Sequence, residues 1–205
     1  MRRQAARLES DPRPLVLLTP KSLLRHPMAA SKPEAFLSGT FMPVLDDPQA
    51  ADRRDKVTRI ILCSGRIAID LESSEYRADA DRIAIVRVEQ IAPFQTTALR
   101  NVLSRYPNAE EIVWVQEEPK NMGAWVYMSE RILDAFPEYE LHYVGRPKRA
   151  SPATGSADRH AVEQAAVISA AFAFESPIAG ANGNGNGVGA AHGKKSAKRV
   201  ATTRA

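Results

Sequence analysis

The sequence predicts an α/β domain, with a mixed, mainly parallel sheet of about five strands and helices on both faces. Short apolar runs typical of buried strands alternate with stretches of helical periodicity. The runs lie too far apart for hairpins, so parallel pairing with right-handed crossovers is expected. A chain of 205 residues, 44 % hydrophobic and 25 % charged, is large enough for one such core.

The elements are expected in the following order. The strands are Leu15–Thr19, Arg59–Cys63, Ile83–Val88, Ile112–Gln116 and Leu141–Gly145. The helices are Arg66–Arg77, Gln95–Tyr106, Trp125–Phe136 and 157–174, with a helical turn at Ser22–Arg25. Asp158 is expected to cap the last helix. Residues 26–56 contain four prolines and little periodicity, which indicates a long ordered loop with a functional or interface role.

The ends of the chain differ from its middle. Residues 1–13 are expected to be an N-terminal arm, 14–176 the domain, and 177–205 a disordered, basic tail rich in Gly and Asn. Residues 178–205 carry five basic residues and no acidic one, so the net charge of +4 leaves about −1 on the first 177. Charge therefore gives no reason to expect nucleic acid as a partner. No apolar run reaches the roughly 18 residues of a membrane helix, so no membrane partner is expected.

The most informative stretch is 112–125, IVWVQEEPKNMGAW. An apolar run ends in Glu117 and Glu118, and Pro119 is expected to stop the strand because it has no N–H to donate. Asn121 and a glycine supply a turn before Trp125 opens a helix. Ligands and partner subunits meet open α/β sheets at the carboxyl ends of strands, so this loop is the central candidate.

Structural interpretations of the polar loop residues compete with chemical ones. Glu117 and Glu118 should point to opposite faces, so we favour carboxylates that cap the loop or pair with arginine over a catalytic Glu117. Ser64–Arg66 fits a tight turn before a helix, with an anion site as the alternative. Cys63, the sole cysteine, is expected to be an inert core thiol. The four histidines have no metal-ligand spacing, and no nucleotide fingerprint is present. The residues alone thus leave the function open.

Six stretches carry a family resemblance. They are PLVLLTPKSLLRHP (14–27), GTFMPVL (39–45), KVTRIILCSGRIAIDL (56–71), IAIVRVEQIAPF (83–94), WVQEEPKNMGAW (114–125) and YVGRPKRASPATGS (143–156). Together, over about residues 2–174, they resemble the carboxy-terminal domain of the thiamine-diphosphate-dependent, decarboxylating first component of 2-oxoglutarate dehydrogenase (succinyl-transferring). The resemblance implies a transketolase C-terminal-like fold. The match around residues 2–4 lies inside the family chain, so a fragment, a split gene product or a truncated reading frame is expected.

The resemblance also implies what the complete enzyme does. Family members decarboxylate 2-oxoglutarate on thiamine diphosphate and Mg²⁺ and pass the succinyl group to the lipoyl succinyltransferase component, in the citric acid cycle. Two preceding domains hold the cofactor within a homodimer, so the expected partners are those domains, the dimer mate and the lipoyl component. No catalytic residue carries over, and this chain alone is expected to bind no cofactor and to be inactive. The location would be the bacterial cytoplasm or the mitochondrial matrix.

Several residues remain as interface or structural candidates. They are Lys21, Arg25, His26, Glu117, Glu118, Asn121, Trp125 and Arg146. Actinobacterial relatives have an acetyl-CoA site, of which only Arg3 and Gln90 match here. Thr40, Pro43, Thr97 and Ala98 replace its other residues, and the loss of three cationic groups predicts no tight acetyl-CoA binding. The alternatives are a free-standing, non-catalytic interaction module, or the equivalent domain of transketolase or another thiamine-dependent 2-oxo acid dehydrogenase.

Overall fold

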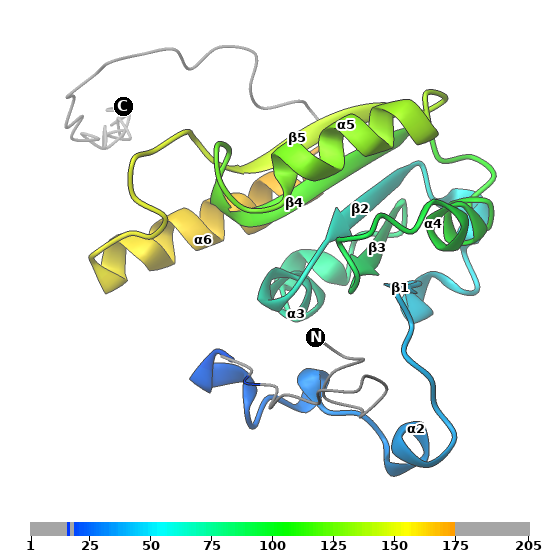
Figure 1. Ribbon diagram of the computed structural model, residues 1–205, viewed down its shortest axis with the longest axis horizontal. Coiled ribbons are helices and arrows are strands. Elements are labelled where there is room, and N and C mark those ends of the chain that lie inside the picture. Colours follow the sequence, from blue (N-terminus) through cyan, green and yellow to red (C-terminus); the bar gives the residue numbers. More distant parts are fainter. Residues whose placement is uncertain (1–15, 17–18, 175–205) are drawn as a thin grey trace, which may run out of the picture. The chain divides into compact units, whose positions relative to one another are not determined.

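A five-stranded sheet organises the computed structural model, which describes residue 16 and residues 19–174 (Figure 1). The strands are β1 (Val44–Leu45), β2 (Arg59–Cys63), β3 (Ile83–Val88), β4 (Glu111–Pro119) and β5 (Glu140–Arg146). They are arranged in the order β1-β3-β2-β4-β5. Strands β2 to β5 are parallel, and β1 pairs antiparallel with β3. The predicted mixed, mainly parallel sheet is therefore confirmed.

Helices cover both faces of this sheet. They are α3 (Arg66–Glu72), α4 (Thr96–Leu103), α5 (Trp125–Ala135) and α6 (Ala157–Phe172), preceded in the chain by the short α2 (Pro33–Leu37). Buried residues of α4 and α5 pack on one face, and buried residues of α3 and α6 pack on the other. No helix among the described residues is long and apolar enough to span a bilayer.

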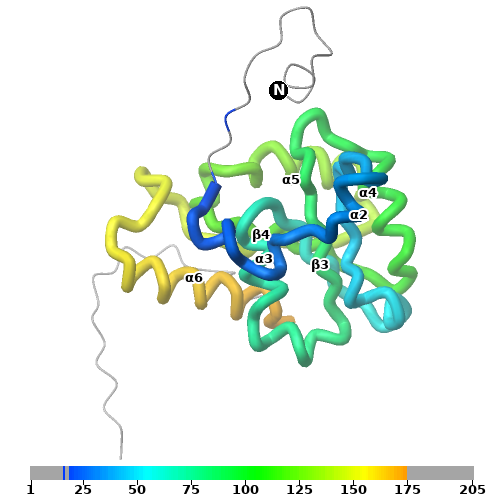
Figure 2. The backbone as a smooth tube through the Cα atoms, turned by 90° about the horizontal axis from the view of Figure 1, so that it is seen from below, coloured from blue at the N-terminus to red at the C-terminus, as the bar shows by residue number. Residues whose placement is uncertain are grey.

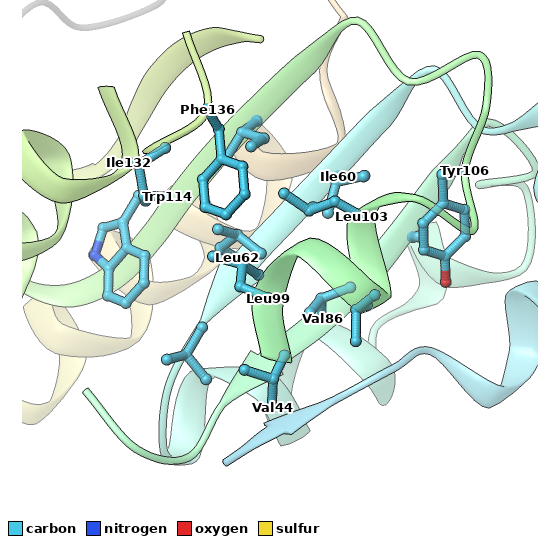
Figure 3. Packing of buried hydrophobic residues seen from close by; sticks show 14 of the residues in the cluster. Val44, Ile60, Leu62, Val86, Leu99, Leu103, Tyr106, Trp114, Ile132 and Phe136 are labelled. Atoms are coloured by element: carbon cyan, nitrogen blue, oxygen red, sulfur yellow. The ribbon is translucent and has the colours of Figure 1, made fainter. Parts of the chain in front are cut away.

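The alternation of side chains along β2 explains why both faces are apolar. Ile60 and Leu62 belong to the core under α4 and α5, whereas Ile61 and Cys63 belong to the core under α3 and α6. Figure 3 shows Leu62 among the side chains of the first core, with Trp114 nearby. Burial raises the pKa of the Cys63 thiol, as expected for an unreactive core cysteine.

The fifth strand lies elsewhere than predicted. Of the expected strand Leu15–Thr19, residues 15, 17 and 18 lie outside the described residues, and Val16 and Thr19 are not in a strand. The edge strand is instead Val44–Leu45, inside the expected loop 26–56. Two residues give no periodicity to detect, because only their pairing with Val88 and Arg87 makes them a strand. The loop also contains α2 and the 3-10 helices η2 (Pro27–Ala29), η3 (Pro48–Ala50) and η4 (Arg54–Lys56).

Several expected boundaries and one cap are also wrong, and the helix expected at Gln95–Tyr106 ends at Leu103. The first long helix ends at Glu72, and a separate 3-10 helix, η5 (Glu75–Arg77), follows it. Pro119 is the last residue of β4, although the strand was expected to end at Gln116. The sheet register shifts between Val115 and Pro119, so the ladder needs no N–H from Pro119. Ser156, rather than Asp158, caps α6 by accepting from the backbone N–H of Arg159.

A buried ion pair fixes the chain beside the edge strand. Asp47 accepts hydrogen bonds from the Arg77 guanidinium (2.5 Å) and from the backbone N–H of Ile85 (2.9 Å), and both charged side chains are buried. Its other oxygen caps η3 by accepting from the Gln49 N–H (2.9 Å). Removing one partner of a buried pair leaves the other charge without compensation.

We expect Asp47→Asn to lower the free energy of unfolding by about 3 kcal/mol, because the Arg77 charge would stay buried without its counter-ion. Urea denaturation measures this. The matched control is Asp81→Asn, whose carboxylate is exposed and lies 3.9 Å from Arg53; it should change stability by less than about 0.5 kcal/mol. Equal effects of the two substitutions would contradict the proposed importance of the buried pair.

Candidate functional site at the carboxyl edge of the sheet

The four parallel strands present their carboxyl ends at one edge, where ligands bind in open α/β sheets. Side chains at the ends of β4 and β5 meet there with polar residues of α3 and α6. These residues form two connected clusters, one around Gln116 and one around Arg146. We refer to them together as the carboxyl-edge cluster.

Gln116 fastens the loop that follows β4. Its side-chain oxygen accepts from the Trp114 indole N–H and from the backbone N–H of Trp125, both at 3.0 Å. Its side-chain nitrogen donates to three main-chain carbonyls, those of Glu118 (3.2 Å), Pro119 (3.2 Å) and Met122 (2.8 Å). The side chain is buried, so these bonds are shielded from water. Sequence reasoning missed this role, although a glutamine closing an apolar run was a usable signal.

Two further residues fix the shape of this loop. Gly123 has φ +66°, and a Cβ at this position would lie 3.0 Å from the Gln116 side-chain nitrogen. The Asn121 amide donates to the main-chain oxygen of Arg149 (2.9 Å) and accepts from its N–H (3.0 Å). Asn121 therefore ties the loop after β4 to the loop after β5.

An aromatic pair lies beside the same loop. The rings of Trp125 and Tyr143 are 4.9 Å apart, and the Lys120 ammonium lies 5.9 Å and 5.2 Å from their respective centroids. The Tyr143 hydroxyl donates to the main-chain oxygen of Arg146 (3.1 Å), and burial raises its pKa to about 12. The phenol thus stays protonated and acts as a donor at neutral pH.

Arg146 and Gln164 join four secondary-structure elements. The buried Arg146 guanidinium donates to the main-chain oxygen of Glu117, to Glu163 (3.1 Å) and to the Gln164 side-chain oxygen (3.1 Å). The Gln164 side-chain nitrogen donates to Asp70 and to the Glu117 carboxylate, both at 2.9 Å. One glutamine and one arginine therefore connect α3, β4, β5 and α6.

Glu163 extends this network into the loop after β5. Its carboxylate accepts from Arg149 (2.8 Å), Thr154 (2.6 Å) and Arg159 (3.0 Å), in addition to Arg146. The hydrogen bonds from Arg149 and Thr154 hold the pKa of Glu163 well below its usual range. Glu163 remains ionised at neutral pH and pins the loop to α6.

The adjacent glutamates occupy different surroundings. Glu117 is half-buried against Gln164, and burial raises the pKa of its carboxyl, opposed in part by Arg66. The Glu118 side chain is exposed. Arg66 pairs with Asp70 at 3.3 Å, and Gly65 (φ +74°) turns the chain into α3 without a side-chain cap. The Ser64–Arg66 turn is thus held by its backbone, with its cation already paired.

Other predicted candidates lie apart from this cluster. Lys21 and Arg25 are exposed, and His26 caps η2 by accepting from the Met28 N–H (3.3 Å). Among residues 19–174, no hydrogen bond or ion pair links these three to the carboxyl-edge cluster. The Gln90 side chain donates to the nearby Pro93 carbonyl (3.4 Å), and its backbone N–H donates to the Pro43 carbonyl (3.0 Å). Arg3 lies outside the described residues. In the described part of the chain, no His, Cys, Asp and Glu side chains are grouped to hold a metal ion.

Replacing Gln116 should loosen the loop while the core remains folded. In Gln116→Leu, the Trp125 N–H loses its acceptor and three loop carbonyls lose their donor, so the amide of Trp125 should exchange with solvent at least tenfold faster. Hydrogen exchange followed by NMR measures this rate. The exposed Gln49→Leu is the control, and an unchanged Trp125 amide in Gln116→Leu would contradict the assignment.

Replacing Glu117 tests the electrostatics of the second cluster. Because its pKa is raised in the folded state, stability falls as pH rises from the ordinary glutamate value of 4.5 through the raised value. Glu117→Gln keeps an acceptor for Gln164 and removes this loss, so it should raise the thermal midpoint at pH 8 more than at pH 4. Thermal scans across this range measure the difference, with the exposed Glu118→Gln as control. A shift independent of pH would show that burial of the charge is not the cause.

Comparison with known proteins identifies the family. Residues 30–172 match the family described as 2-oxoglutarate dehydrogenase C-terminal. The chain is 46 % identical over 186 residues to the 2-oxoglutarate dehydrogenase E1 component of an Exiguobacterium species, covering 88 % of this chain and 20 % of that protein. The proteins of the same name from a Geobacillus species and from Geobacillus kaustophilus are 48 % and 47 % identical over 175 residues, each match covering 84 % of this chain and 18 % of the relative.

The matches cover the strands and helices of the sheet as well as the loops of the carboxyl-edge cluster, all of which lie between residues 30 and 172. The chain spans about one fifth of the length of these relatives. The match covers well over half of the chain, so the chain belongs to the 2-oxoglutarate dehydrogenase C-terminal family.

Proposed function

We propose that this chain serves as the C-terminal domain of a 2-oxoglutarate dehydrogenase first component, where it supports the dimer and the cofactor cleft. The continuous family match over residues 30–172 carries this proposal. The relatives are named as 2-oxoglutarate dehydrogenases, which favours this enzyme over transketolase or another 2-oxo acid dehydrogenase. Residues 14–176 would form the domain, with 1–13 and 177–205 as its arm and tail.

The bonding of the carboxyl-edge cluster supports a structural role. The Arg146 guanidinium and the Glu163 carboxylate each form hydrogen bonds to neighbouring elements of the same domain. Asn121 and Trp125 likewise hold the loop after β4 in place. A group saturated by internal partners is poorly suited to exchanging protons with a substrate. We therefore assign this cluster to shaping a rigid edge.

The remaining candidates are proposed as contacts with the rest of the enzyme. Lys21, Arg25 and Glu118 are exposed, and His26 is partly exposed, so their charged or polar groups can reach a partner. Exposed charges at an interface contribute to specificity and orientation. Gln90, with its weak local hydrogen bond, and Arg3 are proposed to be remnants of a nucleotide site that no longer binds acetyl-CoA tightly.

The chemistry of the complete enzyme would reside outside this chain. Thiamine diphosphate, with Mg²⁺, supplies the electron sink that stabilises the carbanion formed when a 2-oxo acid loses CO₂. Because the matched family is the C-terminal one and the chain spans about one fifth of its relatives, we assign both groups to the rest of the enzyme. The succinyl group would then pass to the lipoyl succinyltransferase component of the complex, in the citric acid cycle. Because the named relatives are bacterial, we propose the cytoplasm as the location.

The test is to purify the native protein with an antibody against the largely exposed loop 147–156 and to assay the purified fraction. We expect thiamine-dependent release of CO₂ from 2-oxoglutarate, with pyruvate as the control substrate, in a fraction containing either a much longer chain or a tightly bound dehydrogenase. The 205-residue chain expressed alone should release none. Turnover by that chain alone, or a native fraction without the activity, would overturn the proposal.

A further inference from the structure

The segment from Lys21 to Met42 has defined structure but almost no burial. It contains η1 (Lys21–Leu23), η2 and α2, and none of these three elements has a buried residue. Figure 2 follows this segment in blue as far as α2. Its apolar side chains are among the most exposed in the described chain, with Leu24 at 70 %, Phe36 at 79 % and Leu37 at 88 % exposure. We call residues 24–42 the apolar segment.

Such a segment needs burial from outside the domain. A helix of five residues, such as α2, is not stable on its own in water, because nucleation fixes several residues for few hydrogen bonds. Grouped exposed apolar side chains mark interaction surfaces, whereas single ones are ordinary. The exposed apolar residues of the later helices, such as Val126, Leu133 and Val162, are separated along α5 and α6.

We infer that the apolar segment docks, through Leu24, Phe36 and Leu37, into an apolar groove on the remaining part of the dehydrogenase first component. This inference rests on the proposed function. The relatives are about five times as long as the match, and the family is the C-terminal one, so most of their chain precedes this domain. The apolar segment is the first part of the described chain after that boundary, where the body and the domain would meet.

The charge of the segment helps to decide between the dehydrogenase body and a second copy as its partner. Between residues 21 and 42 the chain carries Lys21, Arg25 and Lys32 but only one acid, Glu34. If the segment lay on the two-fold axis of a symmetric contact between two copies, it would face itself, and like charges facing each other are unfavourable. A groove with an acidic rim on a different surface satisfies both the apolar side chains and their basic neighbours. We therefore commit to the dehydrogenase body and not to a second copy.

Photo-crosslinking tests this docking directly. The probe is the full chain carrying a benzophenone amino acid at Leu37, produced in its source cells, with the crosslinked peptide identified by mass spectrometry. We expect a peptide from the part of the dehydrogenase first component that precedes this domain, within the same chain or another. The control places the probe at Val162, which is 71 % exposed on α6 and should give no such peptide. Crosslinks to residues 1–205 of a second copy or to an unrelated protein, or equal yields from both positions, would overturn the inference.

A double variant separates docking from folding. Phe36→Ser with Leu37→Ser should leave the thermal midpoint of the chain unchanged, because both side chains are exposed, and should lower co-purification of dehydrogenase activity at least tenfold. Val162→Ser is the matched control and should retain full co-purification. If the double variant retains it as well, the docking inference is wrong while the proposed function stands. If no dehydrogenase activity co-purifies even with the unaltered chain, the docking inference and the proposed function are both wrong.

Discussion

The buried side chain of Gln116 is the contact on which the carboxyl edge of the sheet depends. The part of β4 before Gln116 is apolar on both faces. Where the chain leaves the core at the end of this strand, its backbone N–H and C=O groups still need hydrogen-bond partners. A glutamine meets this need because one amide carries both an acceptor and two donors. Its oxygen accepts from the first N–H of α5, and its two N–H groups are shared among three loop carbonyls, so it couples the direction of the loop to the position of the helix.

The Arg146 network applies the same principle between elements far apart in the sequence. Gln164 on α6 reaches Asp70 on α3 and Glu117 on β4, while Arg146 on β5 holds the same amide from its other side. Buried polar networks of this kind are costly unless every member is satisfied, and once satisfied they favour one arrangement. The edge is therefore rigid, which suits a surface that other domains must meet in a fixed geometry.

Local signals account for what could be predicted from the sequence. The runs that form β2 and β3 are mostly apolar and rich in β-branched residues, so a strand buried on both faces was the clear prediction. Val44 and Leu45 could not be recognised, because two residues become a strand only through pairing with β3. Glu163 and Gln164 were missed for a related reason, since a helix pattern does not reveal which polar residues face a buried arginine seventeen or eighteen positions earlier.

The sheet domain and the segment before it thus differ in how they treat their apolar side chains. From β1 to α6, the domain buries its apolar side chains and pairs its polar ones at the carboxyl edge, so little drives that part to seek a partner. From Lys21 to Leu37, three short helices are bonded locally, and the side chains of Leu24, Phe36 and Leu37 are left largely in water. Covering the three exposed side chains of the second region would remove more grouped apolar surface from water than covering the separate exposed side chains of α5 and α6. The sheet gives the domain a core on each of its faces, and the exposed segment near its start is the part that we propose drives assembly.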